Sequence, residues 1–463
     1  MSEETGLLSA VWAGVPVAAE LSDEAWVAAM VEIEVALARA QARLGVVPES
    51  AASAIADAIK HSFVDVAGLA VRSRGSANPV VEFVREVTAI VAAADPEAAE
   101  YVHRGSTSQD VFDSAAMLLA SRALAAVDAD LGRVCDALAR LADEHRGTPM
   151  AARTLTQHAV PTTFGLKAAG WLSLVMDAQD RLRTVRESLP VSLGGAAGTL
   201  AAYVEYAGLA GVDTAGHGPA LMAEVARELG LRDPGVPWHT HRTPLVDVGW
   251  TVTLVTGALG KIATDVLGAT RTEVGELTEP AGERSGVSSA MPQKQNPVLA
   301  TLVVAAARQA PAYTMMLGAA LLAEDERSPG GWQSEWQPLR EGLRLAAGAA
   351  ATAAELVEGL VVHPDALAAN LALSGGTIVS ERLNVALAPS LGKAPAKALL
   401  ARISRDAAAR EASFGELLTA APELAGVLAP EQVTALLDPA DYLGSADELV
   451  DVVLDRHRHT VVE

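Results

Sequence analysis

Long apolar tracts with helical character constrain this sequence more than any other feature. Two of these tracts cover residues 246–281 and 298–322. Ala and Leu dominate the composition, and half of the residues are hydrophobic while only 4% are aromatic. This composition favours helices packed through small aliphatic side chains over sheets rich in Phe and Tyr. Because a helix that is apolar on most faces must be buried on most faces, we expect an all-α protein built around a bundle of long helices.

The order of the tracts predicts three helical domains. The 463 residues suffice for several domains of roughly 100 to 200 residues each. We expect an N-terminal helical domain over residues 1–100, a central long-helix bundle over 101–350 and a smaller C-terminal helical domain over 351–463. Residues 153–165, around Pro161, and the Gly-rich stretch 190–243 are expected to be irregular connections inside the bundle.

Charge and cysteine content bound the partners and the compartment. The 35 basic and 57 acidic residues give a net charge of −22, which argues against nucleic acid because its binding needs a basic surface. A local Arg or Lys cluster can still bind a small anion. Cys135 is the single cysteine, no signal peptide is evident, and charges interrupt the apolar runs before the ~20 residues that a membrane span requires. We therefore expect a cytoplasmic protein that does not enter a membrane.

Residues 284–297 place small, polar and cationic side chains between the two long helical tracts at 246–281 and 298–322. Gly286 permits unusual backbone angles, and the two prolines of the stretch interrupt any continuous helix. Ser288 and Lys294 could form a base and its electrostatic helper, because a nearby ammonium group favours the ionised form of a weak acid. The same composition also fits an ordinary surface loop.

Two further segments carry polar side chains that fit the binding of an anion. Residues 103–110 place His103, Thr107 and Ser108 before an apolar helical run, where the first N–H groups of a helix attract anions; a plain N-capping cluster is the alternative. Arg242 could clamp a carboxylate by bidentate geometry. The histidines near Arg242 lack a third ligand at suitable spacing, so we expect no metal and no other cofactor.

These segments resemble the conserved regions of the fumarase/aspartase superfamily. Residues 288–297 are similar to its signature loop, Gly-Ser-Ser-x-Met-Pro-x-Lys-x-Asn-Pro, except that Val287 replaces the leading glycine. Residues 103–110 resemble the first region, His-x-Gly-x-Thr-Ser-x-Asp, and residues 154–163 the second, Thr-His-x-Gln-x-Ala-x-Pro-x-Thr. The stretches 238–242 and 325–332 are similar to the carboxymuconate-cycloisomerase branch of the superfamily.

The resemblance implies a β-elimination. The base removes a proton from the carbon next to a carboxylate, an enediolate forms, and fixed donors stabilise its charge before the β-substituent leaves. The catalytic candidates are Ser288 as the base, with His103 and His158 as groups that move or hold a proton. The substrate-binding candidates are Thr107, Ser108, Gln157, Arg242, Met291, Lys294, Asn296 and Arg327. For Arg327, which follows Asp325 and Glu326, a surface salt-bridge cluster is the alternative.

Leu155 departs from the family pattern in a way that limits the leaving group. Related lyases that expel a nitrogen carry a histidine at this position, and general acid catalysis typically contributes roughly 10² to 10⁴-fold. An alkyl side chain delivers no proton, so either His103 or His158 is the acid or the leaving group needs none. We expect a small succinate-type dicarboxylate that gives fumarate, with nitrosuccinate as the first candidate. The alternatives are carboxymuconate cycloisomerisation, then adenylosuccinate cleavage, then a catalytically silent structural relative.

The resemblance also implies a homotetramer. Superfamily members pack long helices from four chains and build each active site from conserved regions of three subunits. The largely apolar long tracts of this sequence agree with burial on most faces.

Overall fold

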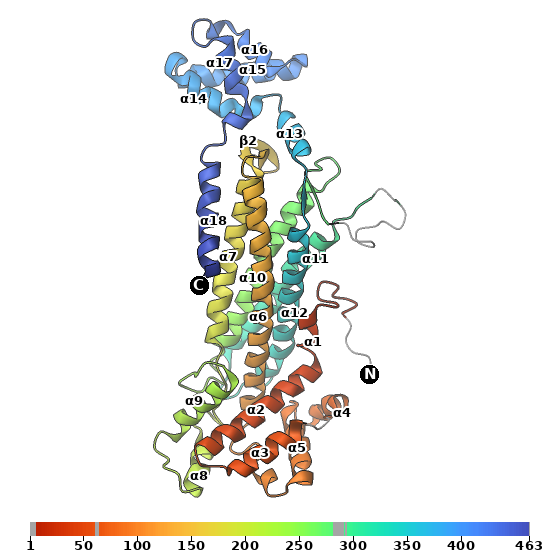
Figure 1. Ribbon diagram of the computed structural model, residues 1–463, viewed down its shortest axis with the longest axis vertical. Helices are drawn as coiled ribbons and strands as arrows, with labels where there is room; N and C mark the ends of the chain where they lie inside the picture. Colours follow the sequence, from red (N-terminus) through yellow and green to blue (C-terminus); the bar gives the residue numbers. More distant parts are fainter. Residues whose placement is uncertain (1–5, 61–63, 281–290, 292–293, 463) are drawn as a thin grey trace. The chain divides into compact units, whose positions relative to one another are not determined.

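The chain folds into a mostly helical structure, seen in a computed structural model that describes residues 6–60, 64–280, 291 and 294–462 (Figure 1). Ser288 and Val287 lie outside the described residues. The α-helices are α1 (Pro16–Ala19), α2 (Asp23–Arg43), α3 (Glu49–Lys60), α4 (Val66–Arg72), α5 (Val80–Ala94), α6 (Ser108–Glu144), α7 (Phe164–Ser188), α8 (Ala201–Leu209), α9 (His217–Leu229), α10 (Thr243–Ala269), α11 (Val298–Ala319), α12 (Gly331–Glu358), α13 (Pro364–Ala372), α14 (Ser380–Leu391), α15 (Lys393–Arg410), α16 (Phe414–Thr419), α17 (Pro430–Leu437) and α18 (Ala446–Val462). The expected helical fold class is confirmed.

Local signals account for where several helices begin and end. The hydroxyl of Ser22 accepts a hydrogen bond from the backbone N–H of Ala25 at 3.2 Å, which caps α2, and two acidic residues occupy the first turn. α10 ends at Ala269, twelve residues before the end of the tract expected to be helical, and Gly275 follows with a φ of +60°. α10 is also long and apolar enough to cross a membrane by length and composition, a test that the core helix of a soluble protein passes too.

Two short antiparallel strand pairs interrupt the helices, which the all-α expectation did not include. β1 (Pro149–Thr154) pairs with β2 (Gln157–Thr163), and β3 (Leu277–Thr278) pairs with β4 (Val361–Val362). The expected irregular connection at 153–165 is therefore a hairpin, and the expected helix over 246–281 includes a strand. Residues 190–243 were also expected to be irregular and instead contain α8 and α9.

The described chain forms two compact units, and the first comprises Met1–Leu131, Asp177–Gly260 and Leu302–Ala353. In this unit α2, α3, α4 and α5 lie together, in red to orange in Figure 1. α9 packs on α2, and a buried cluster that includes Leu37, Tyr203 and Leu221 lies in this part of the unit.

The second unit comprises Gly132–Met176, Lys261–Thr301 and Ala354–Glu463. Its helices α14 to α17, in blue in Figure 1, enclose an apolar cluster that includes Leu383 and Leu387, both fully buried. The domain boundaries at residues 100 and 350 stay predictions.

Candidate active site

The N-terminus of α6 carries two of the predicted carboxylate-binding residues. Thr107 immediately precedes α6 and Ser108 is its first residue. The backbone N–H of Thr107 donates to Oδ2 of Asp110 at 3.2 Å, so a side chain from the first turn of α6 caps the start of the helix. Neither the Thr107 nor the Ser108 hydroxyl has a hydrogen-bond partner among the residues that the structure describes. Both are half-buried beside the positive end of a 37-residue helix, where an anion is favoured.

The carboxylate of Asp110 connects the start of α6 to the Gly-rich turn at residues 194–195, which is far away in the sequence. Asp110 is 1% exposed and accepts hydrogen bonds from the backbone N–H groups of Gly194 at 2.7 Å and Gly195 at 3.0 Å. The Tyr203 hydroxyl donates to it at 3.0 Å, and Nε2 of His239 lies 2.8 Å from Oδ1. Burial, together with the negative charge of Asp110, raises the pKa of Tyr203 well above its ordinary value, so it remains a donor. The Gly-rich turn is therefore fixed before any ligand arrives.

His103 is paired with a buried glutamate. Nδ1 of His103 lies 2.6 Å from Oε1 of Glu34, and its backbone N–H donates to Oε2 of the same carboxylate at 3.1 Å. Burial lowers the pKa of His103, but the charge and hydrogen bond of Glu34 and the charge of Asp110 outweigh it, so the pKa is raised. The pairing leaves Nε2 as the ring nitrogen that could contact a ligand, which fits the predicted role of holding or moving a proton.

Arg242 occupies a buried ionic cluster of its own chain. Its side chain is 1% exposed, and its guanidinium donates to Asp113 at 2.6 Å and to Glu335 at 3.0 Å. Trp332 donates to the same Asp113 carboxylate at 2.9 Å. Burial raises the pKa of Glu335 to about 7, although the hydrogen bonds from Arg242 oppose the shift. The predicted clamp for a substrate carboxylate does not fit this geometry, because two internal carboxylates already engage the Arg242 guanidinium.

Arg327 does lie next to the α6 N-terminus. Its Nε donates to Oε1 of Gln109 at 3.0 Å, and its Nη2 donates to the carbonyl oxygens of Ala196 at 3.2 Å and Gly195 at 3.5 Å. The alternative of a surface salt bridge does not hold within the described residues, where Arg327 contacts a side-chain amide and two backbone carbonyls. We call Thr107, Ser108, Gln109, Asp110 and Arg327 the α6 N-terminal cluster.

The described end of the signature loop belongs to the second unit. Lys294 is exposed, and its backbone N–H donates to the carbonyl oxygen of Met291 at 3.0 Å. The carbonyl oxygen of Asn296 accepts from Val298, the first residue of α11, at 2.9 Å. Glu279 lies before the loop in sequence and accepts the N–H groups of residues 299 and 300 at 3.0 and 2.7 Å, so it caps α11. Ser288, the predicted base, lies outside the described residues.

The hairpin of β1 and β2 carries the remaining predicted residues. Gln157 is exposed and His158 is half-buried opposite Arg153. Leu155 and Thr156 form the two-residue turn with φ of +49° and +70°, a conformation that ordinarily selects Asn or Gly. The Leu155 side chain is 96% exposed. An apolar side chain therefore stands at the tip of the hairpin, where a proton donor was the family expectation.

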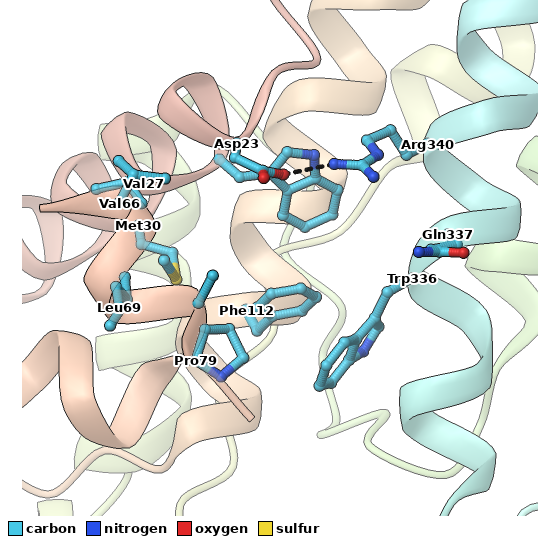
Figure 2. Close-up of a pocket in the computed structure, with 12 residues that line it drawn as sticks. Asp23, Val27, Met30, Val66, Leu69, Pro79, Phe112, Trp336, Gln337 and Arg340 are labelled. Carbon is cyan, nitrogen blue, oxygen red and sulfur yellow. Dashed lines mark hydrogen bonds and ion pairs between the residues drawn. The ribbon is translucent and has the colours of Figure 1, made fainter. Parts of the chain in front are cut away.

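An apolar pocket in the first unit contains none of the predicted site residues (Figure 2). Its volume is about 210 Å³, and the paired side chains of Asp23 and Arg340 face each other at one side. It is lined by Asp23, Trp26, Val27, Met30, Val66, Leu69, Ala70, Pro79, Phe112, Trp336, Gln337 and Arg340. Apolar walls do not suit a dicarboxylate. Metal binding finds no support in the described ranges either, where no group of three or more His, Cys, Asp or Glu side chains could hold an ion.

The sequence motifs did not reveal several buried polar residues around the α6 N-terminus. Glu34, Asp113 and Glu335 are each about 3% exposed or less. Charged side chains are almost never fully buried unless they are paired. An acid inside an apolar helical run, as in Ile33-Glu34-Val35, was the available signal, and its partner could not be read from the sequence.

Comparison with known proteins places the chain in a family. A sequence model described as "Lyase" matches residues 16–311. The chain belongs to this lyase family. A second model, "Adenylosuccinate lyase C-terminus", matches residues 376–453 of the lyase. The nitrosuccinate lyase of Streptomyces davaonensis is 58% identical to it, over 97% of this chain and 94% of that protein.

Cycloisomerases are also similar to the lyase. The 3-carboxy-cis,cis-muconate cycloisomerase of Pseudomonas aeruginosa is 40% identical over 97% of this chain and 96% of that protein. The crystal structure of the 3-carboxy-cis,cis-muconate lactonizing enzyme of Pseudomonas putida superposes with a TM-score of 0.90 at 34% identity, covering 98% of this chain and 99% of that one. The predicted membership of the fumarase/aspartase superfamily is confirmed.

Proposed function

We propose that this lyase converts nitrosuccinate into fumarate and nitrite. The observation that carries the proposal is the 58% identity to a nitrosuccinate lyase, which extends over nearly the whole length of both chains. The hairpin tip supports it, since Leu155 is 96% exposed and cannot protonate a leaving group. Nitrite is a stable anion that departs without a proton.

The reaction balances with the predicted residues alone. The ionised Ser288 hydroxyl, favoured by the nearby Lys294 ammonium, takes the proton from the carbon next to a carboxylate, and the electron pair of that C–H bond becomes the new C=C bond. The C–N bond breaks, and its electron pair leaves with nitrite. Lys294 and Asn296 hold the carboxylate on which the enediolate charge develops, while Thr107, Ser108 and Arg327, supplied by another subunit, hold the other carboxylate.

A homotetramer is part of the proposal. In the first unit, Trp250 on α10 is 61% exposed, and Met315 and Met316 on α11 are 75% and 49% exposed. Exposed apolar side chains of this size are typical of surfaces that other protein covers. Sites completed by neighbouring subunits would explain why Leu155 stands at an exposed tip. We also propose a cytoplasmic location, in accord with the single cysteine.

Carboxymuconate cycloisomerisation is the second candidate, because cycloisomerases at 40% and 34% identity cover nearly the whole chain. Its leaving group is also an anion that needs no strong acid, so Leu155 does not separate the two activities.

Parallel assays distinguish the candidates. Purified protein is offered nitrosuccinate, carboxymuconate and adenylosuccinate separately, with fumarate followed by ultraviolet absorbance and nitrite followed colorimetrically. We expect equal amounts of fumarate and nitrite from nitrosuccinate. Consumption of carboxymuconate without nitrite from nitrosuccinate would contradict the proposal.

The Ser288→Ala variant tests the proposed base. We expect turnover to fall to the background rate while the oligomer, measured by light scattering, stays intact. Near-normal activity in this variant would remove the serine-base mechanism.

A further inference from the structure

The orientation of the buried Gln109 amide is determined by its neighbours. Gln109 is 1% exposed, and its Nε2 donates to Oδ2 of Asp113 at 3.0 Å and to the carbonyl oxygen of His239 at 2.9 Å. Both neighbours are acceptors, so the NH₂ group must face them and Oε1 must face the other way. Arg242 holds the Asp113 carboxylate by two hydrogen bonds, which fixes that acceptor in turn.

Oε1 of Gln109 receives Arg327, and this contact decides which edge of the guanidinium stays available. Nε of Arg327 donates to Oε1, and Nη2 donates to the neighbouring carbonyl oxygens of Ala196 and, at 3.5 Å, Gly195. These two nitrogens form the side edge of a guanidinium. No partner of Nη1 occurs in the described part of the chain, so the end edge, made by Nη1 and Nη2, keeps donors in a geometry that suits a carboxylate.

We propose that Gln109 is a positioning residue of the lyase, which holds Arg327 by its side edge so that the end edge binds a substrate carboxylate. The inference rests on the proposed function for the identity of the substrate. Gln109 acts through Arg327 and does not touch the substrate. It also connects Arg327 to the buried Asp113 carboxylate, so the arginine is directed before the substrate binds.

Substitution of Gln109 by Met tests whether Gln109 positions Arg327 for the substrate or only stabilises the fold. Met is similar in size and makes none of the three hydrogen bonds, and we expect KM for nitrosuccinate to rise about 10-fold to 100-fold with a smaller change in kcat. Gln179→Met is the matched control. Gln179 is 3% exposed and donates to Asp128, also on α6, about 28 Å farther along the helix axis. We expect this control to lower Tm and leave KM unchanged; equal KM values in both variants would overturn the proposal.

A double-mutant cycle with Arg327→Met tests whether the effect passes through the arginine. If it does, Gln109→Met adds no further loss of kcat/KM in the Arg327→Met background. Losses that multiply would contradict the proposal.

A crystal structure of ligand-free Gln109→Met supplies a readout that does not depend on activity. We expect the Arg327 guanidinium to leave the Ala196 carbonyl, and an unmoved guanidinium would overturn the inference. If the wild-type protein does not turn over nitrosuccinate, the proposed function fails, while this structural test of Gln109 still decides between its outcomes.

Discussion

The α6 N-terminal cluster and the tip of the β1–β2 hairpin are built in opposite ways. In the cluster, Asp110 is 1% exposed, and backbone and side-chain donors of the same chain satisfy its carboxylate. At the tip, two residues other than glycine adopt positive φ, and Leu155 is 96% exposed. The α6 N-terminal cluster is therefore organised by its own chain. The hairpin tip carries backbone strain and apolar exposure, which contacts between subunits of the proposed homotetramer would offset.

The largest expected effect concerns the buried ionic cluster beside the α6 N-terminus. Arg242→Met leaves the carboxylates of Asp113 and Glu335 buried without their cation, and we expect a loss of about 3 to 5 kcal/mol in the free energy of unfolding. Urea titration measures it. Arg122→Met is the matched control, because its ion pair with Glu32 is almost half exposed and should cost at most about 1 kcal/mol. Equal losses of unfolding free energy in the two variants would mean that burial does not make the Arg242 ion pairs more important than an exposed pair.

The pH dependence of stability tests the same cluster. The pKa of Glu335 is raised from 4.5 to about 7 in the folded chain. The folded state therefore favours the protonated form, so this contribution to stability is fully present below pH 4.5 and is lost as pH rises through 7. The difference is at most about 3 kcal/mol. We expect Glu335→Gln to remove this dependence in urea titrations between pH 4.5 and 8; an unchanged pH profile would contradict the raised pKa.

The hairpin tip is tested by giving it a proton donor. Leu155→His restores the residue that related lyases use to protonate nitrogen. We expect the rate of nitrite release to stay within about two-fold of wild type, since nitrite needs no acid, whereas general acids typically contribute roughly 10² to 10⁴-fold. Initial rates of nitrite formation measure this. A clear gain would show that the tip takes part in leaving-group departure.

The smallest effect is expected at the strained turn itself. Thr156 has a φ of +70°, and Gly adopts this conformation without steric cost. We expect Thr156→Gly to raise Tm slightly or leave it unchanged. Thr154→Gly, on the adjacent strand, should lower Tm, because it should reduce the free energy of unfolding by up to about 1 kcal/mol. Calorimetry measures both. A marked loss of Tm in Thr156→Gly would mean that the threonine side chain, and not the backbone, maintains the turn.

The helices and the family were predictable from the sequence because their signals are local. Ser22 followed by two acids marks the start of α2, and the apolar tract that begins at Val298 coincides with the start of α11. The hairpin was missed because Leu155 and Thr156 are not residues that ordinarily form a two-residue turn. α8 and α9 were missed because the Gly and Pro residues around them suggested irregular structure.

The candidate site divides in the same way. Motif spacing led to Thr107, Ser108 and Arg327, which the structure brings to one place. The motifs also assigned Arg242 to substrate binding, because a sequence does not show whether the partners of an arginine are carboxylates of the same chain or a bound ligand.

Periodicity, capping residues and family motifs act over short stretches of chain, so the sequence was enough to identify a helical lyase with its polar motifs at the ends of long helices. Which polar groups pair with one another depends on the three-dimensional fold. Asp113 is 129 residues from Arg242 and 222 from Glu335 along the chain, and their pairing depends on the burial of all three together, a condition that no local pattern records.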